Sequence, residues 1–141
     1  MINQLSKLIW ALQSKKYHKT IKNLTKKSIE SIYHNQLIPK IASLLKKNRT
    51  NDSILDLGCG DGYLSNQLTK IGFSVDAVDY SPTAISIAKK TYSQPNFYTL
   101  NAEKIYKLNK KYKVIIACQL MHSLSNGLEI TISQIEKNVS T

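Results

Sequence analysis

The sequence predicts an α/β fold in which a parallel β-sheet carries helices on both faces, a doubly wound arrangement. Three observations support this prediction. From residue 54 onward, short apolar runs alternate with amphipathic runs, the connections between them are short, and a glycine-rich turn follows the first apolar run. Such alternation is typical of units whose strands run parallel. The 141 residues are enough for one domain with its own core.

Four strands are expected, and each is a short run rich in apolar residues. They span residues 54–57, 75–78, 97–100 and 114–117. The last of these runs is apolar throughout, which indicates burial on both faces of the sheet. Because parallel strands end at the same edge of a sheet, the residues just after each strand are expected to line one crevice.

Helices are expected between the strands. They span residues 63–71 and 82–92, with a short polar helix or loop at 103–111 and a last helix after residue 127. Gly72 ends the first of them, and Ser81 caps the second, with Pro82 in its first turn, where proline is favoured. The helices at 63–71 and 82–92 and the last helix have apolar residues at helical spacing that can pack on the sheet.

The first 47 residues are predicted to form a basic helical segment or lid, and residues 48–141 the ligand-binding domain. Pro39 either kinks or begins a helix that ends near Lys47. Residues 1–50 hold eleven basic groups and one acid (+10), whereas residues 51–141 hold nine basic and eight acidic groups (+1). The cationic third could bind RNA, anionic lipid or an acidic carrier protein. It could also reflect composition alone, since nineteen of the twenty basic residues are Lys.

Composition also bounds the class of protein. No run of residues is long enough to span a bilayer, and the apolar piece at 8–12 is too short for the core of a signal peptide. Two cysteines, Cys59 and Cys118, are too few for a disulfide framework. We therefore expect reduced thiols and a cytoplasmic protein, and we expect no metal site.

The most informative segment is the turn after the first expected strand. It runs from Asp56 to Gly62 with the pattern D-x-G-x-G-x-G. Glycine is needed where the backbone has positive φ or passes close to a ligand, and the amides that begin the next helix point at that ligand. The third glycine of a dinucleotide fingerprint would fall at Tyr63, and the Gly-Lys-Ser/Thr of a phosphate loop is absent. The turn predicts a nucleotide-like ligand of another kind.

The pattern from Asp56 to Gly62 resembles the first motif of the class I S-adenosylmethionine-dependent methyltransferases, which share a Rossmann-like fold. Residues 75–82 resemble the second motif of that family, and 101–103 and 112–124 resemble its third and fourth. The resemblance covers about residues 28–138 and is strongest to the small-molecule methyltransferases. It implies S-adenosyl-L-methionine as cofactor and direct displacement of its methyl group onto a small-molecule acceptor.

The resemblance also implies roles for particular residues. Asp79, at the end of the second strand, would accept the ribose hydroxyls, a role that its position after a strand also indicates. Tyr80 would pack on the adenine, Asn101 (where the family has Asp) and Ala102 would read it, and the backbone carbonyl of Cys118 would bind the methionine amino group. The expected cofactor-binding set is Asp56, Gly58, Cys59, Gly60, Gly62, Asp79, Tyr80, Asn101, Ala102 and Cys118.

His122 is the candidate catalytic residue. It lies a turn beyond the fourth strand, where members of the family line the acceptor pocket, and an imidazole can act as a general base near neutral pH. A lone histidine is also often a packed or solvated side chain. Cys118-Gln119 matches two letters of the Pro-Cys-Gln of cytosine carbon methyltransferases, a match that we interpret as coincidence.

The chain departs from the family in length, because the family sheet has more strands than the four expected here. The strand at 114–117 would then have an open edge. Three explanations stay open: a truncated or split gene, a dimer or partner chain that pairs with this edge, or a degenerate relative. The alternative functions are a non-catalytic cofactor-binding partner subunit and, less favoured, an RNA methyltransferase that uses the basic N-terminal helices.

Overall fold

The computed structural model describes residues 27, 30–31, 33–47, 53–117, 133 and 135–139. The chain separates into two compact units, Met1–Thr50 and Asn51–Thr141, and each is described by itself. Among the described residues, no helix is long and apolar enough to cross a membrane. Most of the predicted basic helical segment before residue 33, and the start of the last expected helix, lie outside these residues.

In the first unit a π-helix, η1 (Tyr33–Leu37), leads directly into an α-helix, α4 (Ile38–Lys47). Pro39 is the second residue of α4, in the first turn, where its fixed φ is tolerated. A proline ring crowds the preceding turn and removes one N–H, and the wider π-helical turn lies just before it. Pro39 therefore stands where the helix type changes.

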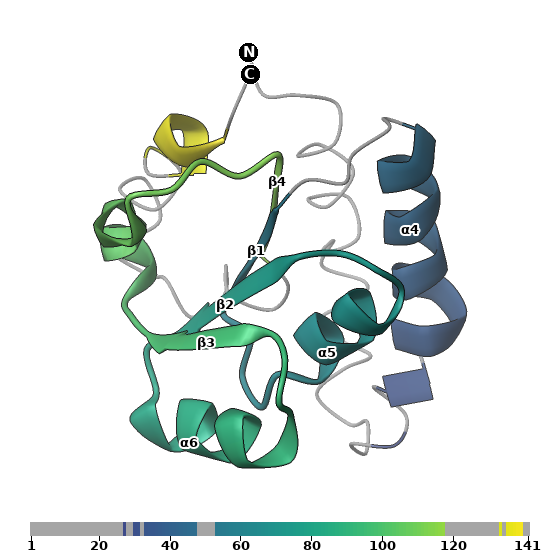
Figure 1. Ribbon diagram of the computed structural model, residues 1–141, viewed down its shortest axis with the longest axis horizontal. Helices are drawn as coiled ribbons and strands as arrows, with labels where there is room; N and C mark the ends of the chain where they lie inside the picture. The colour runs from purple at the N-terminus through teal and green to yellow at the C-terminus, as the bar shows by residue number, and fades with distance from the viewer. Residues whose placement is uncertain are drawn as a thin grey trace, which may run out of the picture. The chain divides into compact units, whose positions relative to one another are not determined.

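In the second unit, four parallel strands form one sheet in the order β3-β2-β1-β4 (Figure 1). The strands are β1 (Ile54–Leu57), β2 (Val75–Asp79), β3 (Asn96–Thr99) and β4 (Val114–Ile116). The predicted α/β class with a parallel sheet is confirmed. Since β2 and β4 both pair with β1, the strand order reverses beside β1. Such a reversal opens a crevice at the carboxyl ends of the strands.

The strand boundaries differ from the predicted ones by a single residue. β3 begins and ends one residue early, at Asn96 and Thr99, while β2 extends to Asp79. Asn96 belongs to β3 because it pairs in register with Asp76 and donates from its side-chain amide to the Asp76 carboxylate at 2.8 Å. A polar residue with such a partner gives no signal in the apolar periodicity of the sequence.

The helices follow the strands in the expected order: α5 (Tyr63–Lys70), α6 (Pro82–Thr91) and a 3₁₀-helix, η2 (Ala102–Leu108). The Ser81 hydroxyl caps α6 by accepting the N–H of Ala84 at 3.2 Å, and Pro82 is the first residue of that helix, as predicted. Gly72 follows α5 with a φ of 101°, as a helix-ending glycine does. The segment expected as a short helix or loop is the helix η2.

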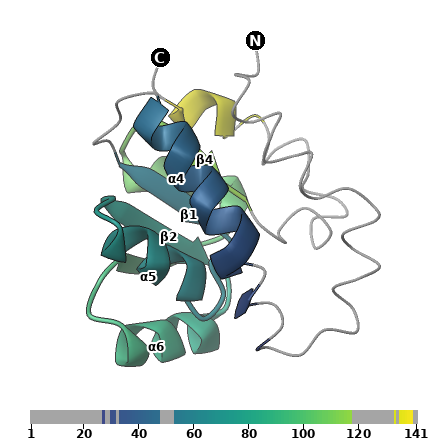
Figure 2. The ribbon, with the colours of Figure 1, turned by 90° about the vertical axis from the view of Figure 1, so that its right-hand side faces the viewer.

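Side chains alternate between the two faces of the sheet. One face packs with η2 and the short helix at 135–138, and the other with α5 and α6 (Figures 1 and 2). The first core contains Leu55, Leu57, Val78, Ala102, Ile105, Tyr112 and Ile115, and the second Ala77, Ile85, Ala88 and Phe97. The sheet is therefore a buried middle layer whose ends, rather than its faces, are open to a ligand.

One charged group is buried on the face that carries Tyr112. Asp76 of β2 is 3% exposed, and its carboxylate accepts hydrogen bonds from Lys110 Nζ at 2.8 Å, Asn96 Nδ2 at 2.8 Å and Tyr112 Oη at 2.9 Å. Burial by itself would raise the pKa of Asp76, but these donors outweigh burial and hold the pKa below its ordinary value. The cluster ties β2 to β3 and to the segment before β4.

Candidate functional site

A glycine loop (residues 58–62) connects β1 to α5 at the carboxyl end of the sheet. Gly58, Gly60 and Gly62 have positive φ values of 79°, 55° and 80°, a region that other residues rarely adopt. The N–H of Gly58 donates to the carbonyl oxygen of Val78 at 2.8 Å, so the loop lies against the end of β2. The predicted strand–turn–helix arrangement is confirmed.

Two of these glycines are needed for different reasons. A Cβ at Gly62 would lie 2.5 Å from Cε1 of Phe97 and 3.1 Å from Cβ of Ala88, so the core under the loop has no room for a side chain. A Cβ at Gly60 would meet nothing within 4 Å. The Gly60 backbone therefore faces open space, where a ligand can approach the main chain.

The Asp79 carboxylate joins the glycine loop to the start of α6. Its Oδ2 accepts the N–H of Gly60 at 2.9 Å, and its Oδ1 accepts the N–H of Ser81 at 2.9 Å. A carboxylate offers about four acceptor positions, so both oxygens can still accept hydroxyl groups of a ligand. Asp79 is partly exposed, in contrast to the buried residues that precede it in β2.

Asp56, the other carboxylate expected at the rim of the crevice, lies beneath it. It is 1% exposed, and its Oδ2 accepts a hydrogen bond from the Ser65 hydroxyl of α5 at 2.5 Å. Burial raises the pKa of Asp56 to about 6; the Ser65 hydrogen bond offsets part of this rise, and the charge of Asp79 adds to it. Asp56 can therefore affect a ligand only indirectly, by positioning the loop or through the electric field of its own charge.

Ser65 is a site residue that sequence reasoning missed. It is 0% exposed and lies on the buried side of α5 with Leu64 and Leu68. A polar residue on the apolar side of a helix is the signal that could have identified it, because a buried hydroxyl needs a hydrogen-bond partner.

Cys59 lies in the glycine loop, where the charges of Asp56 and Asp79 act on its thiol. Burial, and after it the negative charges of Asp56 and Asp79, raise the pKa of the Cys59 thiol well above its ordinary value. The thiol therefore stays protonated at neutral pH, and the environment does not suit a nucleophile.

The other predicted site residues lie in the turns after β2 and β3, or outside the described residues. Tyr80 follows Asp79 and is 72% exposed. Asn101 caps η2, its Oδ1 accepting the N–H of Glu103 at 2.9 Å. The side chain of Ala102 is buried in the core, so only its backbone can face a ligand. Cys118 and His122 lie outside the described residues.

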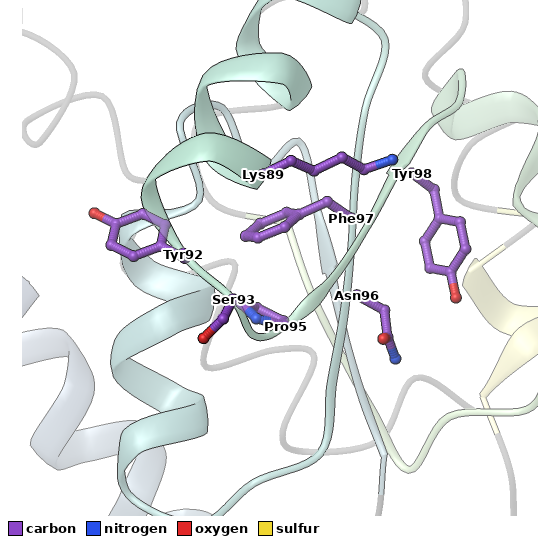
Figure 3. Close-up of a pocket in the computed structure, with 7 residues that line it drawn as sticks. All are labelled: Lys89, Tyr92, Ser93, Pro95, Asn96, Phe97 and Tyr98. Atoms are coloured by element: carbon purple, nitrogen blue, oxygen red, sulfur yellow. The ribbon is translucent and has the colours of Figure 1, made fainter.

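A concavity lies along β3, at the end of α6, and contains none of the predicted site residues. Its volume is about 350 Å³, and it is lined by Lys89, Tyr92, Ser93, Pro95, Asn96, Phe97 and Tyr98 (Figure 3). Figure 3 shows Tyr92 and Tyr98 pointing away on opposite sides, so their rings do not converge on a ligand. β3 is an edge strand of the described sheet, and a lysine such as Lys89 beside an edge discourages pairing with other chains.

The sequence matches known proteins over most of its length. A family described as a methyltransferase domain matches residues 29–140. The mitochondrial ubiquinone biosynthesis O-methyltransferase of Schizosaccharomyces pombe is 33% identical over 90 residues, which cover 60% of this chain and 33% of that protein. The ribosomal RNA small subunit methyltransferase C of Buchnera aphidicola is 32% identical over 130 residues, which cover 84% of this chain and 36% of that protein. The chain thus spans about a third of the length of these relatives.

The fold also matches solved structures. The magnesium protoporphyrin IX methyltransferase of Synechocystis PCC 6803, solved with bound SAM, superposes with a TM-score of 0.65 at 18% identity, covering 99% of this chain and 74% of that chain. At this identity the likeness concerns the fold alone. The family match spans the glycine loop, β2 and the turns after β2 and β3, which are the segments where the motifs were found. The chain therefore belongs to the methyltransferase domain family, as its motifs predicted.

Proposed function

We propose that this chain is an S-adenosylmethionine-dependent methyltransferase that acts on a small-molecule acceptor. One observation carries the proposal: the Asp79 carboxylate bonds to the N–H of Gly60 beside an open stretch of backbone, where the strand order reverses. A carboxylate and an approachable main chain at such a crevice are what a nucleoside ligand requires.

The groups around the crevice have the chemistry that an adenosyl ligand needs. Asp79 would accept the ribose hydroxyls, and Gly60 would lie against the ligand with no side chain between them. Tyr80 offers an exposed aromatic face to the adenine. The Asn101 oxygen already accepts one backbone N–H but has a second lone pair for the adenine amino group, and Ala102 would contribute its backbone.

When bound, S-adenosylmethionine supplies a methyl group on a positively charged sulfur, which is a strong electrophile. The chain's own residues would then orient the cofactor relative to the acceptor. The proposed roles of the Cys118 carbonyl, in binding the amino group, and of His122, as general base, stay predictions.

The nature of the acceptor is supported by the relatives. The Schizosaccharomyces pombe protein, an O-methyltransferase of ubiquinone biosynthesis, supports an oxygen nucleophile on a small molecule. The Buchnera aphidicola protein supports RNA as the second candidate. Electrophoretic binding to RNA across salt concentrations separates the two, because phosphate contacts make affinity fall steeply with salt.

A catalytically inactive cofactor-binding subunit is the alternative function. In that proposal a partner chain adds a strand beside β4, which is the end strand on its side of the described sheet and is buried along its length. Cofactor binding without methyl transfer by the chain alone, followed by transfer when a partner is added, would favour it.

The proposed site is tested by titration calorimetry with S-adenosylhomocysteine, the reaction product. We expect the wild-type chain to bind it and Asp79→Ala to bind about tenfold or more weakly, because hydrogen bonds to a charged group are lost. Glu136→Ala, which removes an exposed acid from the helix at 135–138, should bind as the wild type does. No binding by the wild-type chain, or equal binding by Asp79→Ala, would refute the site.

A further inference from the structure

We propose that Ser65 is a positioning residue that keeps the Asp56 carboxylate ionised, and that this buried pair tunes the crevice toward a positively charged cofactor. The inference rests on the proposed function, because it concerns the binding of S-adenosylmethionine. It goes beyond that function by assigning a role to a residue of α5 that does not line the crevice.

The geometry of the pair is the first support. Ser65 is 0% exposed and Asp56 is 1% exposed, and the hydroxyl donates to Asp56 Oδ2 at 2.5 Å. Among the described residues, Ser65 is the one group that donates a hydrogen bond to this carboxylate. Because Ser65 is the third residue of α5, the helix that begins at the glycine loop also fixes the position of the donor.

No other described group near Asp56 stabilises its negative charge. Asp79 at the end of β2 opposes ionisation, and the Cys59 thiol of the loop is neutral. On the β4 side, the residue in register with Asp56 is the apolar Ile116. Among the described residues, no basic group contributes to the pKa of Asp56. Burial has the largest effect on the pKa of Asp56, and the Ser65 hydroxyl is the described group that opposes it.

The consequence for binding follows from charge. Burial raises the pKa of Asp56 to about 6, so the carboxylate becomes ionised as the pH approaches neutrality. S-adenosylmethionine carries a positive sulfur, whereas the sulfur of S-adenosylhomocysteine is neutral. An ionised Asp56 close beneath the loop favours the first compound over the second. The ratio of the affinity for S-adenosylmethionine to the affinity for S-adenosylhomocysteine should then depend on pH. A change in the stability of the fold affects both affinities equally and cancels in this ratio.

The experiment measures binding of both compounds by calorimetry between about pH 5 and pH 8. In the wild-type chain we expect the preference for S-adenosylmethionine to rise with pH, with a midpoint set by the ionisation of Asp56. In Ser65→Ala the midpoint should move upward by about one to two pH units, because a hydrogen bond to the charged form is lost. Thr69→Val removes an α5 hydroxyl that bonds to the Ser65 carbonyl oxygen and not to Asp56, so its midpoint should stay with the wild type.

The outcomes separate this inference from the proposed function. Equal midpoints in the wild type and Ser65→Ala would overturn the inference, as would a ratio that does not change with pH. If Ser65→Ala does not fold, Ser65→Cys makes the same test, since it has nearly the same volume and a weaker donor. Asp56→Asn should remove the pH dependence. If neither compound binds the wild-type chain at any pH, the proposed function itself fails.

Discussion

Two aspartates are buried in the same sheet and have opposite pKa shifts. Asp56 of β1 is 1% exposed and Asp76 of β2 is 3% exposed, so burial opposes the charge of both. Asp56 has one neutral hydroxyl as donor, whereas Asp76 has an ammonium, an amide and a phenol. Burial therefore raises the pKa of Asp56 to about 6, while the donors lower the pKa of Asp76.

The difference separates a structural acid from a candidate functional one. Asp76 lies where three parts of the chain meet, and its hydrogen bonds hold them together. Asp56 lies beside the glycine loop, and its charge costs the fold free energy at neutral pH. An unfavourable buried charge next to a crevice is typical of functional sites, where stability is given up for activity. The same substitution at the two positions should therefore have opposite effects.

Asp76→Asn should have the largest effect, a loss of about 3 kcal/mol in the free energy of unfolding at neutral pH, because the buried acceptor loses its charge and one of its two oxygens while the donors remain. The pKa of Asp76 is lowered in the folded state. The stability that Asp76 contributes is therefore present above the ordinary Asp pKa, and it is lost as the pH falls through the folded pKa. Urea unfolding measures it, with Glu136→Gln as the control on an exposed acid. A loss below about 1 kcal/mol would contradict the structural role.

Asp56→Asn should stabilise the chain by about 2–3 kcal/mol at neutral pH, the free energy that corresponds to a pKa raised by roughly two units. The folded pKa is raised from 3.8 to about 6, so the unfolded chain ionises first and wild-type stability falls across this range as pH rises. The variant should lack this fall. Thermal unfolding at several pH values measures the difference in stability between the variant and the wild type. A variant that is less stable than the wild type at neutral pH would contradict the opposite effects expected at Asp56 and Asp76.

Tyr112→Phe should have the smallest effect, a loss of about 1–2 kcal/mol, because the Asp76 carboxylate keeps two other donors. The ring of Tyr112 is fully buried, so the apolar packing should survive the substitution. Tyr106→Phe is the matched control, since Tyr106 is 55% exposed. Equal unfolding midpoints for the two variants in urea would show that the phenol contributes little to the Asp76 cluster.

Much of the fold could be predicted because its signals are local. The four strands lie within one residue of their predicted ranges, and Ser81 and Pro82 begin α6 as expected. The sequence also predicted that the loop after β1 lies near Asp79, because parallel strands end at the same edge of a sheet. The N–H of Gly60 does lie 2.9 Å from the Asp79 carboxylate.

Other features of the candidate site could not be predicted, because their partners are distant in sequence. Nothing local indicates that Phe97 lies under Gly62 and excludes a side chain there. Ser65 is a polar residue, and its partner Asp56 lies on another element, although the Ser65 side chain is fully buried. Asp56 was expected at the rim with Asp79 because both follow or end strands, but its side chain points toward α5 and is covered.

The sequence by itself determined the parallel sheet, the glycine loop and the family, because apolar periodicity, caps and glycines with positive φ act over a few residues. Only the tertiary structure decided that the pKa of Asp76 is lowered and that of Asp56 is raised. That property depends on burial and on donors 9, 20, 34 and 36 residues away along the chain. Electrostatic free energies depend on such neighbours in space, which no local pattern encodes.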